Sequence, residues 1–291
     1  MKLLIVNADD FGRSPGVNQG ILDAHTQGIV TSTTVMINLP DAAPGLDLLQ
    51  QHAPDLGTGL HLNLTSGRPV SGPDRVRSLV NDSGAFYTIG EWAAQIETFD
   101  PDHVQREITA QIERFISLTG QPPDHLDAHH HASYLHPAGL ETMLAAATSH
   151  AIPMRNAGLD LPPETVMETL TAMMPDLPRP FALALIEDLK VTLVDNTPPF
   201  WPARFEMGFF GEHATLGDLL VILTTLPDDS ITEIMCHPGY PDDALSTSGY
   251  RDERATEVDH LTHAATLECV RAEGIQLITF GDLPGSPGAL A

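Results

Sequence analysis

Two adjacent carboxylates begin the part of the sequence that could do chemistry. Asp9 and Asp10 follow an apolar run at residues 3–6, which is typical of a strand buried on both faces. Adjacent carboxylates repel each other unless a cation or a shared proton relieves them. The pair suits a division of labour in which one carboxylate binds a metal ion and the other stays free as a general base. A turn or a helix N-cap is the alternative reading.

A histidine-rich segment points more strongly to a metal site. The run HLDAHHH at residues 125–131 contains Asp127, His129 and His131. If the run is a strand, its alternation puts these three side chains on one face. Neutral imidazole is the usual ligand of Zn²⁺, and a neighbouring carboxylate can orient it. The run therefore predicts histidine ligands of a metal ion, with Asp127 as a carboxylate that orients them.

Two further segments each contribute one histidine. In GLHLNLT, at residues 59–65, alternation separates His61 and Asn63 from the leucines. His237, in MCHPGY, ends another apolar run, and its ordinary pKa near 6.5 suits a general acid. A structural histidine is the alternative at both positions. Together, the clusters meet the minimum for metal-assisted hydrolysis of an amide or an ester.

The elements that must position these residues alternate between short β-rich runs and amphipathic helical patterns, which predicts a parallel α/β sheet. We expect strands at residues 3–6, 29–37, 59–64, 125–131, 152–155, 231–236 and 275–280. Roughly seven parallel strands favour a closed or nearly closed β/α barrel, in which active sites lie at the C-terminal strand ends. We expect a single domain at residues 1–281 and a loose tail at 282–291. The proline-rich stretch 156–215 is either an inserted subregion or barrel helices joined by rigid loops, and we favour the second.

Composition limits the possible partners. The chain has 291 residues and a formal net charge of −25, which repels nucleic acid and anionic membranes. Cys236 and Cys269 are the only cysteines, and their spacing excludes a disulfide framework or a Cys-based zinc knuckle. No apolar run is long enough for a signal peptide or a membrane span, so we expect a soluble cytoplasmic protein.

Five motifs in a fixed order resemble one known family. NADDFG, TSTTVMIN, GLHLNLT, HLDAHHH and MCHPGY are similar to segments of the YdjC-like carbohydrate deacetylases, which include the chitooligosaccharide deacetylases. The resemblance covers the chain from residue 3 to residue 280. It implies a distorted, possibly incomplete TIM-like barrel, a homodimer, and removal of acetyl groups from acetylated amino sugars.

The resemblance also implies roles for single residues. By motif, Asp9 matches the family's catalytic base and His237 its late catalytic histidine. The matching ligands of one divalent metal ion are Asp10, His61 and His129. Mixed carboxylate and imidazole ligation favours Zn²⁺, whereas the resemblance implies Mg²⁺, so both ions stay open.

Substrate contacts are expected around these positions. The loop at residues 66–87 is long for a βα connection, which is typical of binding loops and lids. The expected contacts are Asn63, His131, Arg68, Phe86 and Arg251. Arg251 lies with Arg254 and Glu257 in a YRxxRxxE stretch similar to a family element. The chain departs from the family at Ser133, where a further histidine is common, and His136 is the candidate replacement.

Two other functions remain open on this scaffold. A metal-dependent phosphoesterase usually needs more carboxylates at a polynuclear site, and it fits poorly with so acidic a chain. A non-catalytic carbohydrate- or metal-binding protein would have no use for a spare base at Asp9.

Overall fold

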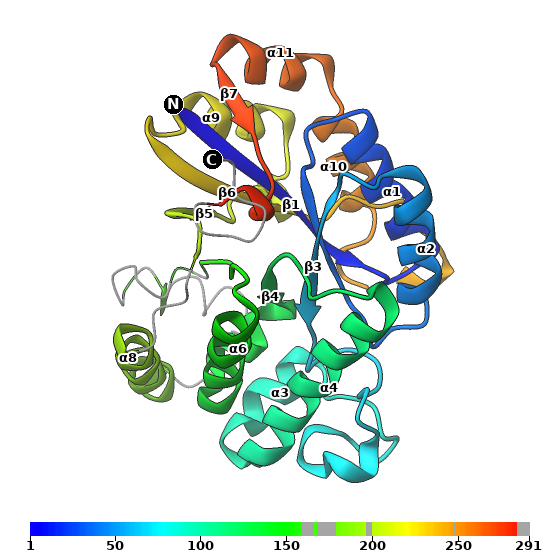
Figure 1. Ribbon diagram of the computed structural model, residues 1–291, viewed down its shortest axis with the longest axis vertical. Coiled ribbons are helices and arrows are strands. Elements are labelled where there is room, and N and C mark those ends of the chain that lie inside the picture. The colour runs from blue at the N-terminus through cyan, green and yellow to red at the C-terminus, as the bar shows by residue number, and fades with distance from the viewer. Residues whose placement is uncertain are drawn as a thin grey trace.

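A single curled parallel sheet organises the chain. The computed structural model describes residues 1–156, 158, 164, 166–167, 179–195, 200–246 and 248–283. Among these residues the sheet has seven strands, in the order β4-β3-β2-β1-β6-β5 with β7 beside the start of β1. Figure 1 shows the strands curling into part of a barrel instead of lying flat. This is the distorted, incomplete TIM-like barrel that the sequence predicts.

The strand positions follow the sequence pattern closely. The strands are β1 (Lys2–Phe11), β2 (Ser32–Val35), β3 (Gly57–Leu62), β4 (Leu126–Ala128), β5 (Arg204–Glu206), β6 (Ser230–Cys236) and β7 (Ile275–Leu277). The strand expected at residues 152–155 is reduced to one bridge, between Leu126 and Met154. A strand that the sequence did not predict, β5, pairs with β6 at the other end of the strand order. The prolines that precede β5 obscured its strand pattern in the sequence.

Helices surround the sheet (Figure 1). They are α1 (Pro15–Thr26), α2 (Ala42–His52), α3 (Ile89–Gln95), α4 (Pro101–Thr119), α5 (Ala132–Leu135), α6 (Pro137–His150), α8 (Arg179–Asp195), α9 (Leu216–Thr225), α10 (Glu253–Leu261) and α11 (Ala264–Ala272). Helix α1 begins as its sequence predicts, since Ser14 Oγ accepts a hydrogen bond from Val17 N at 3.2 Å and Pro15 follows the cap. It packs on β1 between α2 and α10, while α4 packs on β3 and α6. No helix among the described residues is long and apolar enough to cross a membrane.

Strand β1 separates two environments. Leu4, Val6 and Ala8 belong to the main hydrophobic core. Ile5 points to the other face, where it meets Phe280 in a small apolar cluster. Burying a side chain such as Phe280 contributes about 1.5–3 kcal/mol. Because strand neighbours alternate, the residues that follow Ile5 on its face belong to the barrel interior.

Two expectations fall partly outside the described residues. Of the expected tail, residues 284–291 are not among them, whereas Leu283 packs in the small apolar cluster. Of the proline-rich stretch, most of residues 157–178 are likewise outside them. In the described part of that stretch, β5 joins the sheet and α8 packs against α5 and α6.

Candidate metal centre and catalytic site

A bulge at the end of β1 turns two neighbouring carboxylates toward the same region. The register between β1 and β2 shifts between Ala8 and Phe11, and Asp10 has a φ of 74°. In a regular strand Asp9 and Asp10 would point to opposite faces. The bulge and the left-handed residue re-aim Asp10, so that both carboxylates are buried near His61 and His237. Strain of this kind persists only where the surrounding structure holds it.

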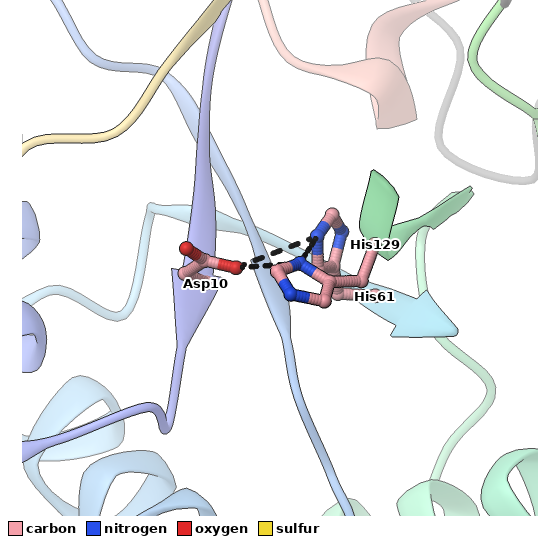
Figure 2. Close-up of side chains that lie close together, drawn as sticks. All are labelled: Asp10, His61 and His129. Atoms are coloured by element: carbon pink, nitrogen blue, oxygen red, sulfur yellow. Dashed lines mark hydrogen bonds and ion pairs between the residues drawn. The ribbon is translucent and has the colours of Figure 1, made fainter. Parts of the chain in front are cut away.

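Three donor atoms from three segments converge next to this bulge. Figure 2 shows the side chains of Asp10, His61 and His129 pointing toward one another. Asp10 Oδ1 lies 3.0 Å from His129 Nδ1 and 3.6 Å from His61 Nε2. The two imidazole nitrogens are 3.3 Å apart. Sequence reasoning predicted this set, and the fold brings all three together.

The three donors fit a divalent metal ion. Neighbouring ligands of an ion with bonds of about 2.1 Å are roughly 3.0–3.4 Å apart. Asp10 Oδ1 is buried, and although it lies near His129 it has no aligned hydrogen bond among the described residues. A buried acceptor without a partner costs about 1–3 kcal/mol, which a bound cation would remove. The geometry and the donor chemistry therefore agree with a metal centre.

Asp127 orients His61. Its Oδ1 lies 2.7 Å from His61 Nδ1, and its Oδ2 accepts a hydrogen bond from Thr34 Oγ1 at 3.0 Å. A proton on Nδ1 then leaves the Nε2 lone pair facing Asp10. Burial by itself lowers the pKa of His61, but Asp127 and the nearby Asp9 outweigh it and raise this pKa to about 8.

The histidine run is not a continuous strand. Strand β4 ends at Ala128, and His129–His131 forms a 3₁₀ turn in which His130 and His131 have φ of 53° and 55°. The expectation that alternation puts Asp127, His129 and His131 on one strand face is therefore wrong. The turn brings His129 toward Asp10, while Asp127 reaches His61 from the strand itself.

Arg155 crosses the barrel interior and binds the second carboxylate of the pair. Its Nη1 and Nη2 donate to the two oxygens of Asp9 at 2.8 and 2.6 Å, and its Nε donates to Glu233 Oε1 at 2.7 Å. Nη1 also lies 3.0 Å from Asp127 Oδ2. Burial alone would raise the pKa of Asp9, but Arg155 outweighs it and holds this pKa well below its usual range. Glu233 differs, because burial dominates there and raises its pKa to about 7.

Arg254 plays a similar part for Asp10. Its Nη2 donates to Asp10 Oδ2, and its Nη1 lies 3.5 Å from the carbonyl oxygen of His237. Glu257 accepts a hydrogen bond from the backbone N–H of His237. Two residues of the YRxxRxxE stretch thus reach the site. The third, Arg251, is exposed and lies 4.0 Å from Asp252.

His237 sits at the end of β6, beside the two carboxylates of β1. Its Nδ1 is buried and has no hydrogen-bond partner among the described residues. Burial lowers its pKa to about 4, so the ring is neutral near pH 7. The sequence suggested an imidazolium at this position, whereas burial of the ring disfavours its charged form.

The residues expected to contact substrate differ in their surroundings. Asn63 is buried and shapes a turn, since its Oδ1 accepts from the backbone N–H groups of Thr65 and Ser66. His131 is 8% exposed and packs edge-on against Phe205. Both lie close to the metal-ligand segments in sequence and stay candidates for substrate binding.

The loop at residues 66–87 leaves from the same end of the sheet. At its start, Thr65 Oγ1 lies 2.9 Å from His130 Nδ1, next to the proposed ligand His129. Arg68 is exposed and donates to the carbonyl oxygen of Ser83. Phe86 is 4% exposed and belongs to the hydrophobic core, so its surroundings give no support to a substrate contact.

At the departure from the family pattern, Ser133 is buried and its Oγ has no hydrogen-bond partner among the described residues. His136 is 6% exposed, its Nδ1 lacks a partner in the same way, and its ring packs near Phe99.

Sequence reasoning missed the polar residues that organise the site from inside the barrel. Asn7 Nδ2 donates to Asp9 Oδ1 at 2.9 Å, and Glu233 holds Arg155 Nε. The signal for Arg155 was an arginine at the end of an otherwise apolar run at residues 152–155. A buried arginine needs carboxylate partners, and an arginine in that position pointed to an interior ion pair.

Known proteins resemble this chain along almost all of its length. The family described as YdjC-like protein matches residues 3–272. A carbohydrate deacetylase of Brevibacillus brevis is 34% identical over 281 residues, covering 96% of this chain and 99% of the relative. A chitooligosaccharide deacetylase of Yersinia enterocolitica is 33% identical, covering 97% and 99%.

A solved structure agrees with the fold. A protein of Enterococcus faecalis V583, whose name refers to cellobiose-phosphate cleavage, superposes with a TM-score of 0.77 at 29% identity, covering 97% of this chain and 98% of that one. The motifs that converge at the candidate metal centre, at residues 9–10, 61 and 129, all lie inside the matched range. Sequence and fold together show that this chain belongs to the YdjC-like protein family.

Proposed function

We propose that this protein is a metal-dependent carbohydrate deacetylase that removes N-acetyl groups from an acetylated amino sugar or oligosaccharide. The observation that carries the proposal is the set of donors on Asp10, His61 and His129, beside a carboxylate, Asp9, whose two oxygens are both bound by Arg155. The names of the relatives support a substrate of the chitooligosaccharide type. The family resemblance also leads us to propose a homodimer, and the hydrophobicity pattern of the sequence leads us to propose a cytoplasmic location.

The metal ion would be held by Asp10, His61 and His129. When bound, such an ion polarises the acetyl carbonyl and lowers the pKa of water, which supplies the nucleophile near neutral pH. Two imidazoles and one carboxylate favour Zn²⁺ over Mg²⁺. Asp127 keeps His61 in the tautomer that can bind.

Asp9 would accept the proton of the attacking water. Arg155 keeps it ionised, and Arg155 and Asn7 fix its orientation. Oδ1 accepts from both of these residues, whereas Oδ2 accepts only from Arg155 and still has a lone pair to offer. The low pKa of Asp9 makes it a weak base. Arg155 therefore makes Asp9 a weaker base, but it keeps the carboxylate charged and in one orientation over the working pH range.

His237 would act on the opposite side of the scissile amide. The neutral ring carries one N–H group, which can donate a hydrogen bond to the oxyanion that forms on the acetyl carbon. Sequence reasoning left two roles open, proton donor and oxyanion stabiliser. The burial of His237 favours the second.

The experiment is a measurement of acetate release from N-acetylglucosamine oligomers by the chelated protein and by the protein reloaded with Zn²⁺ or Mg²⁺. We expect no release after chelation and recovery with at least one ion. Release of phosphate from phosphorylated sugars without acetate release would support a phosphoesterase instead. Binding of the sugar without any release would support a non-catalytic protein.

A further inference from the structure

Three aromatic rings pack together at the edge of the candidate site. Phe210 stacks on Tyr250 with ring centroids 4.5 Å apart and an angle of 11° between the planes. His237 meets both rings edge-on, at 5.3 Å from Phe210 and 5.6 Å from Tyr250. The catalytic candidate His237 therefore borders directly on this pair.

Phe210 is exposed even though one of its faces is covered. Its side chain is 45% exposed, while the preceding residue, Phe209, is fully buried in the core. Tyr250 covers one face of the Phe210 ring, so the exposed area belongs to the remaining face and edge. Full burial of a phenylalanine stabilises a fold by about 1.5–3 kcal/mol. The exposed ring of Phe210 gives only part of this stabilisation.

The ring behind Phe210 is fixed and connected to the site. Tyr250 Oη donates to Glu257, the same carboxylate that accepts from the backbone N–H of His237. The backbone N–H of Gly211 lies 3.4 Å from Tyr250 Oη. Arg254, which binds Asp10, lies over the Tyr250 ring at 5.7 Å from its centroid. The position of Phe210 is thus set by the same residues that hold the metal ligand and His237.

We propose that Phe210 is the platform on which a sugar ring of the substrate stacks, next to the acetylated residue. The proposal rests on the proposed deacetylation. An aromatic face binds the C–H face of a pyranose ring by dispersion and by removal of apolar area from water. Such a contact needs no charge, which suits a neutral sugar on a chain with a net charge of −25. Because Phe210 contacts His237, the stacked ring would lie beside the departing amine.

The test compares Phe210→Ala and Phe210→Trp with Leu118→Ala. Leu118 is also 45% exposed, but it lies on α4 and is not one of the site residues. We expect Phe210→Ala to raise KM for an N-acetylglucosamine tetramer about tenfold, equivalent to about 1.4 kcal/mol of binding. Its kcat and its metal content should stay close to wild type. Phe210→Trp should restore KM, and Leu118→Ala should leave it unchanged.

A second measurement separates this proposal from the proposed function. Calorimetric titration of the metal-free protein with the tetramer measures binding without turnover. Equal affinity of wild type and Phe210→Ala would overturn the platform, whether or not acetate is released. If the wild type binds the tetramer about tenfold more tightly than Phe210→Ala but releases no acetate with any ion, the platform stands and the deacetylation fails.

Discussion

Arg155 donates one hydrogen bond to each carboxylate oxygen of Asp9, and both side chains are almost completely buried. This pairing distinguishes the two carboxylates of the bulge. Asp9 and Asp127 also lie close enough to His61 to form a second group of possible metal donors. Arg155 compensates both of these carboxylates, whereas Arg254 binds only Oδ2 of Asp10 and leaves Oδ1 without an aligned hydrogen bond among the described residues.

The first prediction concerns this pairing. Lysine keeps the charge but cannot make two parallel hydrogen bonds, so Arg155→Lys should leave Asp9 misoriented. We expect kcat to fall about 10²-fold or more, as for loss of a positioned base, with unchanged metal content. Denaturant unfolding should also show a loss of about 1–3 kcal/mol, because lysine leaves some of the buried carboxylate oxygens without a donor. Wild-type kcat in this variant would remove Arg155 from the positioning role.

The second prediction concerns the metal. His129→Ala removes one of the three donors, so metal analysis of the purified variant should show strong loss of bound ion. His52→Ala, at the exposed end of α2, is the matched control and should bind the wild-type amount. Full occupancy in His129→Ala would exclude His129 from the ligand set.

The third prediction separates the two roles of His237. If the neutral ring donates a hydrogen bond to the oxyanion, a side-chain amide can partly replace it. His237→Gln should then be clearly more active than His237→Ala, which should lose about 10²–10³ in kcat. If His237 is instead the proton donor, the amide cannot transfer a proton, and both variants should be equally impaired.

The fourth prediction concerns stability at acidic pH. Burial lowers the pKa of His136 from 6.5 to about 4. Between these two values the unfolded chain binds a proton that the folded chain does not, so stability falls as the pH falls through this window. His136 therefore contributes a loss of up to about 1.4 kcal/mol per pH unit.

The variant His136→Leu tests this contribution. Urea unfolding between pH 7 and pH 4 should show a shallower loss of stability in His136→Leu than in wild type. His52→Gln controls for removal of a histidine from the surface. An identical slope in His136→Leu and wild type would show that His136 does not titrate differently on folding.

The sequence was informative wherever a residue's role depended on its own strand. Alternation and strand ends predicted β1, β3 and β6, and placed the Asp9–Asp10 pair and His61 at strand ends, whereas only the family resemblance singled out Asp10 as a ligand. Prediction from the sequence failed where the backbone departs from regular strand geometry. The bulge at Asp10 and the turn at His129–His131 depend on left-handed residues that alternation cannot anticipate. The interior partners of Arg155 come from three strands, β1, β4 and β6, so only the folded barrel reveals them.

The measurement that tests the central claim most directly compares two neighbouring substitutions. Bound metal and acetate release from N-acetylglucosamine oligomers are measured on the same samples of wild type, Asp9→Asn and Asp10→Asn. We predict that Asp9→Asn keeps its metal and loses about 10²–10⁴ in rate, and that Asp10→Asn loses both metal and activity. Loss of metal in Asp9→Asn, or turnover close to wild type in either variant, would contradict the division of labour between the two carboxylates.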